Sequence, residues 1–161
     1  MTKPLTILVA EDDSSDALLL KLAFSEAEVI VPMNFVRDGM EAMDYLRGVP
    51  PFDDRAKYPL PDLLVLDLKM PRMDGFEVLT WLRQQPGSER ITVAVLSGTT
   101  WPADIQRAYA LGADFCLNKL FGFRQLVNVV ERMAEKWSLP LPAAPTDQQP
   151  RLPSRIPRPG V

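Results

Sequence analysis

The sequence predicts an α/β domain in which helices cover both faces of a five-stranded parallel sheet. Short apolar runs alternate five times with segments of helical periodicity over residues 1–137, a pattern typical of parallel sheets. The clearest run, Leu63–Leu66, is apolar at every position, as expected of a strand buried on both faces. The carboxyl ends of such strands share one edge of the sheet, where folds of this class carry their functional sites.

Four other apolar runs are expected to form the remaining strands: Leu5–Ala10, Met33–Val36, Ile91–Leu96 and Phe115–Leu117. Helices are expected between and after the strands, over residues 14–28, 39–47, 75–85, 102–111 and 123–137. Ser14 or Ser15 is the expected cap of the first helix, Pro102 the start of the fourth and Gly112 its stop.

Residues 138–161 differ from the rest of the chain. Seven of the 16 prolines lie between residues 140 and 159, and this segment has almost no apolar periodicity. We therefore expect a folded domain over residues 1–137 and a Pro-rich tail over residues 138–161 that is extended or disordered. Such a tail should be dispensable for folding.

The composition excludes several kinds of chemistry. The chain has no histidine and one cysteine, so it can form no Ser-His-Asp or Cys-His site, no His-ligated zinc site and no phosphohistidine. A net charge of −3 argues against non-specific nucleic-acid binding. One cysteine allows no internal disulfide, and we find neither a signal peptide nor a membrane span, so we expect a soluble cytoplasmic protein.

Polar side chains follow the expected strands at their carboxyl ends. Glu11 and Asp12 follow the first strand, Asp67 the third, Ser97 the fourth and Lys119 the fifth. Each acid alone has a plain structural explanation, because aspartate is common in loops and begins many helices. Together, these residues place three carboxylates, a hydroxyl and an ammonium at one sheet edge.

This combination of charges suits phosphoryl chemistry. Clustered carboxylates repel one another, and a hard divalent cation such as Mg²⁺ relieves that repulsion. With the cation bound, the Asp67 carboxylate can attack an electrophilic phosphorus. Lys119 and Ser97 can then bind phosphoryl oxygens. Because the chain has no histidine, the phosphoryl donor must lie on another molecule.

These residues resemble the receiver domain of two-component response regulators over about residues 4–137. The segment around Asp67, LVLDLKMPRMDG, is the most specific, and three others support it: Ile7–Asp13, Val95–Gly98 and Leu111–Lys119. The resemblance implies a flavodoxin-like doubly wound (βα)5 fold with strand order 2-1-3-4-5. It also implies a phosphorelay switch that is not an enzyme and catalyses only its own phosphorylation and dephosphorylation.

By position, the resemblance makes Asp67 the phosphoacceptor. It also implies that Mg²⁺ binds the carboxylates of Glu11, Asp12 and Asp67. The backbone carbonyl of Lys69 would be the fourth protein ligand. Ser97 and Lys119 would bind the phosphoryl group. We interpret Asp74 as the N-cap of the third helix rather than as a metal ligand.

A longer loop at 48–61 and Trp137 narrow the resemblance to stand-alone regulators that partner phytochrome-type sensor histidine kinases. Nothing after Trp137 resembles an effector domain, so output would come from partner binding, from a homodimer or from onward phosphoryl transfer. Phe121, Phe123 and Trp137 are candidates for a dimer face, with ordinary core packing as the alternative.

Two positions depart from the family. Leu120 stands where a proline with a cis peptide bond usually follows the lysine. A non-proline cis bond costs about 3–4 kcal/mol, so we expect a trans bond, a rearranged loop and a less firmly held Lys119. Cys116 replaces an aromatic switch residue and is too small to act as one. We interpret it as a small buried apolar residue rather than a redox site, with Phe115 facing the opposite side.

The main alternative function is a receiver-fold scaffold that binds partners without phosphorylation. Leu120 and Cys116 favour this alternative, whereas the complete acidic set and Lys119 oppose it. A hydrolase with an aspartyl nucleophile is disfavoured because Lys69 stands where such an enzyme needs a second acid. A nucleotide-binding fold is disfavoured because no Gly-rich loop follows the first strand.

Overall fold

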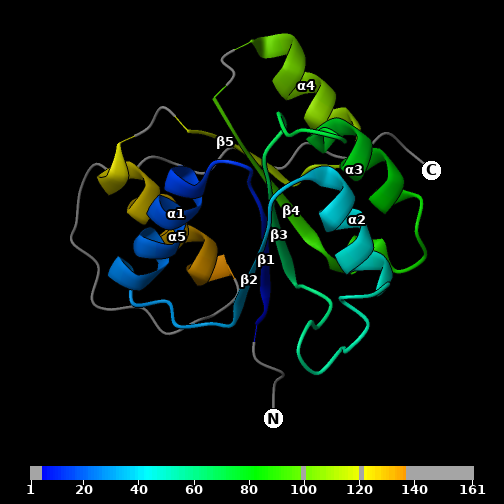
Figure 1. Ribbon diagram of the computed structural model, residues 1–161. Coiled ribbons are helices and arrows are strands. Elements are labelled where there is room, and N and C mark those ends of the chain that lie inside the picture. Colours follow the sequence, from blue (N-terminus) through cyan, green and yellow to red (C-terminus); the bar gives the residue numbers. More distant parts are fainter. Residues whose placement is uncertain (1–4, 99–100, 120–121, 137–161) are drawn as a thin grey trace.

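The computed structural model describes residues 5–98, 101–119 and 122–136, which form a three-layered α/β domain (Figure 1). The strands are β1 (Ile7–Ala10), β2 (Met33–Val36), β3 (Leu63–Leu66), β4 (Thr92–Ser97) and β5 (Phe115–Asn118). The helices are α1 (Ser14–Glu26), α2 (Gly39–Arg47), α3 (Gly75–Arg83), α4 (Pro102–Ala110) and α5 (Phe123–Lys136), with a short 3-10 helix at Ser88–Arg90. All neighbouring strands are parallel, in the expected order β2-β1-β3-β4-β5.

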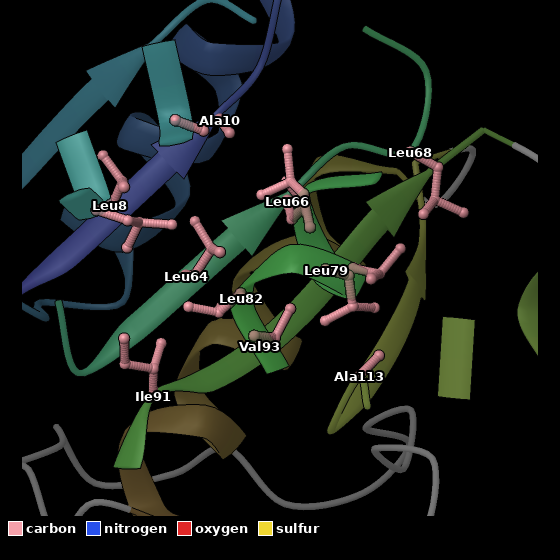
Figure 2. Packing of buried hydrophobic residues seen from close by; sticks show 14 of the residues in the cluster. Leu8, Ala10, Leu64, Leu66, Leu68, Leu79, Leu82, Ile91, Val93 and Ala113 are labelled. Carbon is pink, nitrogen blue, oxygen red and sulfur yellow. The ribbon is translucent and has the colours of Figure 1, made fainter. Parts of the chain in front are cut away.

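The sheet separates two hydrophobic cores, because successive residues of a strand point to opposite faces. Leu64 and Leu66 of β3 pack toward α2, α3 and α4, whereas Leu63 and Val65 pack toward α1 and α5. Figure 2 shows the first of these cores, in which Leu79 of α3 lies among the strand side chains. The helices therefore cover both faces of the sheet and leave its carboxyl edge to carry polar residues.

The structure corrects the expected boundaries of the first helix. The cap of α1 is Asp13 rather than Ser14 or Ser15, and its carboxylate accepts hydrogen bonds from two backbone amides of the first turn. The helix ends at Glu26 rather than at residue 28. Glu28 has φ 57°, in the left-handed region, so it cannot continue a right-handed helix.

Other boundaries move by one or two residues. β1 begins at Ile7 rather than Leu5, α3 ends at Arg83, and β4 and β5 run on to the polar residues at their ends. Pro102 begins α4 as expected, and Gly112 follows its end with φ 110°. Trp137 and the tail at 138–161 lie outside the described residues. None of the described helices is long and apolar enough to cross a membrane.

A buried ion pair holds the amino-terminal edge of the sheet, opposite the polar edge. Arg83 of α3 lies 3.0 Å from the carboxylate of Asp114, which precedes β5. The same guanidinium donates to the carbonyls of Gly112 and Ile91, both at 3.0 Å. Asp114 also accepts a 2.9 Å hydrogen bond from the amide of Val93. These contacts tie α3, β4 and β5 together away from the site.

Candidate functional site

Three carboxylates converge at the carboxyl edge of the sheet, as the sequence predicts. Glu11 and Asp12 directly follow β1 and Asp67 directly follows β3, and the register pairs the last residues of these strands, Ala10 and Leu66. One oxygen of each carboxylate lies within 4.8 Å of the other two. Glu11 and Asp67 are only 6% and 4% exposed, whereas Asp12 is exposed. Two of the three acids are therefore largely shielded from water.

Lys119, which directly follows the edge strand β5, brings an ammonium into this acidic cluster. Its backbone amide donates to the carbonyl of Ser97 at 2.9 Å, which continues the β4–β5 pairing by one residue. Its Nζ lies 2.7 Å from Glu11 Oε2 and 2.9 Å from Asp67 Oδ2. The residues at the ends of β1, β3 and β5 thus form one ionic network.

Sequence reasoning missed one member of this network, Asp16. Its carboxylate projects from the first turn of α1 and lies 3.0 Å from Lys119 Nζ. Its backbone amide donates to the capping carboxylate of Asp13. Asp16 lies four residues after Asp12, and this spacing is the only feature of the sequence that could have pointed to a place near the site. An acid in the first turn of a helix is ordinarily explained by the helix dipole, so the spacing alone does not predict the contact with Lys119.

The electrostatics of the cluster favour a further positive charge. Burial raises the pKa of Glu11 to about 7 against the opposing hydrogen bond from Lys119, and the charge of Asp67 adds to the rise. Burial also raises the pKa of Asp67, again opposed by Lys119. Burial alone would lower the pKa of Lys119, but hydrogen bonds to Glu11, Asp67 and Asp16 raise it. A single ammonium therefore does not fully compensate the buried carboxylates.

The other predicted residues lie close to this network. Ser97 ends β4 and is buried. Lys69 is exposed, and its backbone amide donates to Asp67 Oδ1 at 3.2 Å. Asp74 is the N-cap of α3, as interpreted from the sequence. Its carboxylate accepts from the amide of Glu77 at 2.9 Å, and the Glu77 carboxylate accepts from the amide of Asp74 at 2.8 Å.

Cys116 and Phe115 point to opposite faces of β5, as strand alternation predicts. Phe115 is buried in the core beneath α1 and α5, whereas Cys116 packs partly buried on the other side. Burial raises the pKa of the Cys116 thiol to about 12, so it remains protonated at neutral pH. Its backbone amide donates to the hydroxyl of Tyr109, a buried residue of α4. Leu120, with the expected trans bond and rearranged loop, lies outside the described residues. The expectation of a less firmly held Lys119 is wrong, because three carboxylates lie within 3.0 Å of its Nζ.

This donor set has a clear chemical preference. Carboxylate oxygens are the ligands that hard cations such as Mg²⁺ and Mn²⁺ prefer. An ammonium beside them suits the oxygens of an anion such as a phosphoryl group. The site could therefore hold a divalent cation together with a phosphoryl group at the Asp67 carboxylate.

The doubly wound fold and the acidic carboxyl edge define a receiver-type signalling domain. Residues 7–131 match the family of response regulator receiver domains, and the chain belongs to this family. The family accepts phosphoryl groups, which agrees with the chemistry of the site.

Two curated relatives match over most of their length. The probable methanogenesis regulatory protein FilR2 of Methanothrix harundinacea is 34% identical over 134 residues, covering 83% of this chain and 84% of its own. The response regulator Rcp1 of Synechocystis is 31% identical over 143 residues, covering 88% of this chain and 95% of its own.

Solved structures agree. The phosphorylated cyanobacterial phytochrome response regulator RcpA superimposes with a TM-score of 0.75 at 34% identity, covering 88% of this chain and all of its own. The Mn²⁺-bound form of Rcp1 gives a TM-score of 0.74 at 30% identity, with 87% and 100% coverage. The chain is thus similar, nearly end to end, to stand-alone response regulators of phytochrome signalling.

Proposed function

We propose that Asp67 is the phosphoacceptor of this receiver domain. The observation that carries the proposal is the position of its carboxylate, which is buried at the end of β3 with Oδ2 2.9 Å from Lys119 Nζ. In the reaction, an Asp67 oxygen attacks the phosphorus of the donor. The bond from phosphorus to the donor breaks, and its electron pair leaves with the donor. The product is an aspartyl phosphate.

The neighbouring residues would share the charges of this reaction. Mg²⁺ fits the carboxylates of Glu11, Asp12 and Asp67 with the backbone carbonyl of Lys69, and when bound it neutralises the acids and one phosphoryl oxygen. The similarity to a protein solved in a Mn²⁺-bound form supports a divalent cation here. Lys119 would bind a second phosphoryl oxygen and Ser97 a third.

The phosphoryl donor we propose is a sensor histidine kinase of the phytochrome type. Similarity to RcpA, named a phytochrome response regulator, supports this choice, and the absence of histidine from the chain requires a donor on another molecule. In this account the protein acts in the cytoplasm, binds no nucleic acid, and catalyses only its own phosphorylation and dephosphorylation.

Output through a homodimer is part of the same proposal. Of the three aromatic residues expected at a dimer face, Phe123 is described, and it is 43% exposed at the start of α5 rather than packed in the core. Phe121 and Trp137 lie outside the described residues. Sedimentation of the phosphorylated and unphosphorylated chain would show the dimer as a change in mass.

Acetyl phosphate tests the proposed function without any kinase. With Mg²⁺, the wild-type chain should gain one phosphoryl group in an intact mass spectrum, and chelation of the metal should abolish the gain. Asp67→Asn should take up none, whereas Asp53→Asn, which removes an exposed acid of the 48–61 loop, should behave as wild type. Uptake by Asp67→Asn at the wild-type rate would refute the assignment. No uptake by the wild type would favour a phosphorylation-independent scaffold.

A further inference from the structure

The ammonium of Lys119 is held by three carboxylates that have different duties in the proposed reaction. Glu11 and Asp67 belong to the cluster of oxygens that can hold a metal ion, and Asp16 does not. All three lie within 3.0 Å of Lys119 Nζ. Asp16 is therefore the partner of Lys119 that remains available when a cation engages the other two acids.

The position of Asp16 is fixed independently of the lysine. It lies in the first turn of α1, where its backbone amide donates to Asp13 Oδ1 at 3.0 Å. α1 in turn packs on the sheet through buried residues such as Leu20 and Phe24. The Asp16 carboxylate thus reaches Lys119 from an anchored helix, and the two residues are 103 positions apart in the chain.

Lys119 needs such an anchor if its ammonium is to act at one fixed place beside Asp67. Lysine has a flexible four-carbon stem, so its ammonium takes many positions unless partners restrain it. A charged partner on one side lets the ammonium remain directed at Asp67 while its other protons are free to bind a phosphoryl oxygen. The Asp16 side chain is 38% exposed, and its carboxylate is not part of the cluster of Glu11, Asp12 and Asp67 that could hold a metal ion.

We propose that Asp16 is a positioning residue that holds the Lys119 ammonium beside the reacting oxygen of Asp67. This inference rests on the proposed function of Asp67. It differs from a merely structural role for Asp16, in which its loss would lower stability and leave the rate of phosphoryl transfer unchanged.

The test compares phosphorylation rates with acetyl phosphate at saturating Mg²⁺. Asp16→Asn and Asp16→Ala should slow phosphorylation about threefold to tenfold, the range expected for losing one hydrogen bond of ordinary strength, because Asp16 acts on the reaction only through Lys119. Asp16→Glu should restore part of the rate. Glu26→Gln is the matched control, because it removes a charge from the exposed far end of the same helix, and it should keep the wild-type rate.

A second measurement separates positioning from stability. The thermal midpoint of Asp16→Asn should stay within a few degrees of wild type. Asp16 is the exposed member of the pair, and Lys119 keeps its ion pairs with Glu11 and Asp67, so the loss should be close to that of a surface ion pair, about 0–1 kcal/mol. In a Lys119→Met background, Asp16→Asn should have no further effect on the rate, because the residue acts through the lysine.

The outcomes are distinguishable. If the wild type accepts phosphate and Asp16→Asn keeps the wild-type rate, the positioning role is wrong and the proposed function stands. If Asp16→Asn slows the reaction equally with and without the Lys119 ammonium, Asp16 acts by another route and the inference is overturned. If the wild type accepts no phosphate on Asp67, both fall together.

Discussion

Replacement of Lys119 by methionine should destabilise the metal-free protein markedly at alkaline pH. The substitution keeps most of the apolar stem and removes the only described ammonium in contact with Glu11 and Asp67. Both acids are less than 10% exposed, so each would remain as a buried, uncompensated charge. Breaking a buried ion pair in this way typically costs about 3–5 kcal/mol.

Two features of the structure place the expected loss at the low end of that range. The Lys119 side chain keeps 17% of its surface exposed, so it is partly hydrated. Glu11, whose pKa is already about 7, can take up a proton, and each pH unit of such relief is worth about 1.4 kcal/mol. We therefore expect a loss of about 3 kcal/mol at pH 8, or about 10 °C in the thermal midpoint for a domain of this size.

Urea denaturation at pH 8 and at pH 5.5, with and without Mg²⁺, measures this effect. The deficit of Lys119→Met should shrink at pH 5.5, where the acids are protonated more easily, and should shrink again when Mg²⁺ replaces the missing charge. Lys21→Met, at an exposed position of α1, should remain as stable as wild type under all conditions. A Lys119→Met protein as stable as wild type at pH 8 without Mg²⁺ would refute the reasoning.

Three further predictions concern pH, the buried ion pair and the tail. Burial raises the pKa of Glu11 from 4.5 to about 7. Protonation of Glu11 therefore stabilises the fold fully below about pH 4.5, and this contribution is lost as pH rises through 7. Because Mg²⁺ must displace that proton, calorimetry should show tighter Mg²⁺ binding at pH 8 than at pH 6, and equal affinity would contradict this. Asp114→Ala should lower the free energy of unfolding by about 3–5 kcal/mol, because it leaves the Arg83 guanidinium and the Val93 amide without this buried acceptor. A loss below about 1 kcal/mol in urea would show that the carbonyl partners of Arg83 compensate its charge without Asp114. A chain ending at Leu141 should keep its thermal midpoint and its phosphate uptake, and a large drop in either would mean that residues 142–161 contact the domain.

The order of strands and helices could be predicted because it follows from local patterns. Leu63–Leu66 is apolar at every position and became a central strand, and Asp74 followed by Glu77 formed the expected capping box. The local sequence does not decide the cap of α1, because Asp13, Ser14 and Ser15 are all residue types that cap helices well, and the cap is Asp13 because the helix begins at Ser14.

The site was predictable to the extent that strand ends define it. Glu11, Asp67 and Lys119 each directly follow a strand, so a parallel sheet brings them to one edge independently of the conformation of the loops. The contact of Asp16 with Lys119 depends on the helix phase after the cap and on a partner 103 residues away. The same holds for Arg83 and Asp114, whose pairing is set by tertiary packing and not by either local sequence.

The most direct test of the central claim is the position of the phosphoryl group in the phosphorylated chain. After transfer from acetyl phosphate or from a phosphorylated phytochrome-type kinase, reduction with borohydride converts an aspartyl phosphate to homoserine. Peptide mass spectrometry should then find homoserine at position 67 and at no other aspartate. When Mg²⁺ is chelated before the transfer, no homoserine should form. Homoserine at Asp12 or another acid, or its absence despite an active donor, would contradict the account.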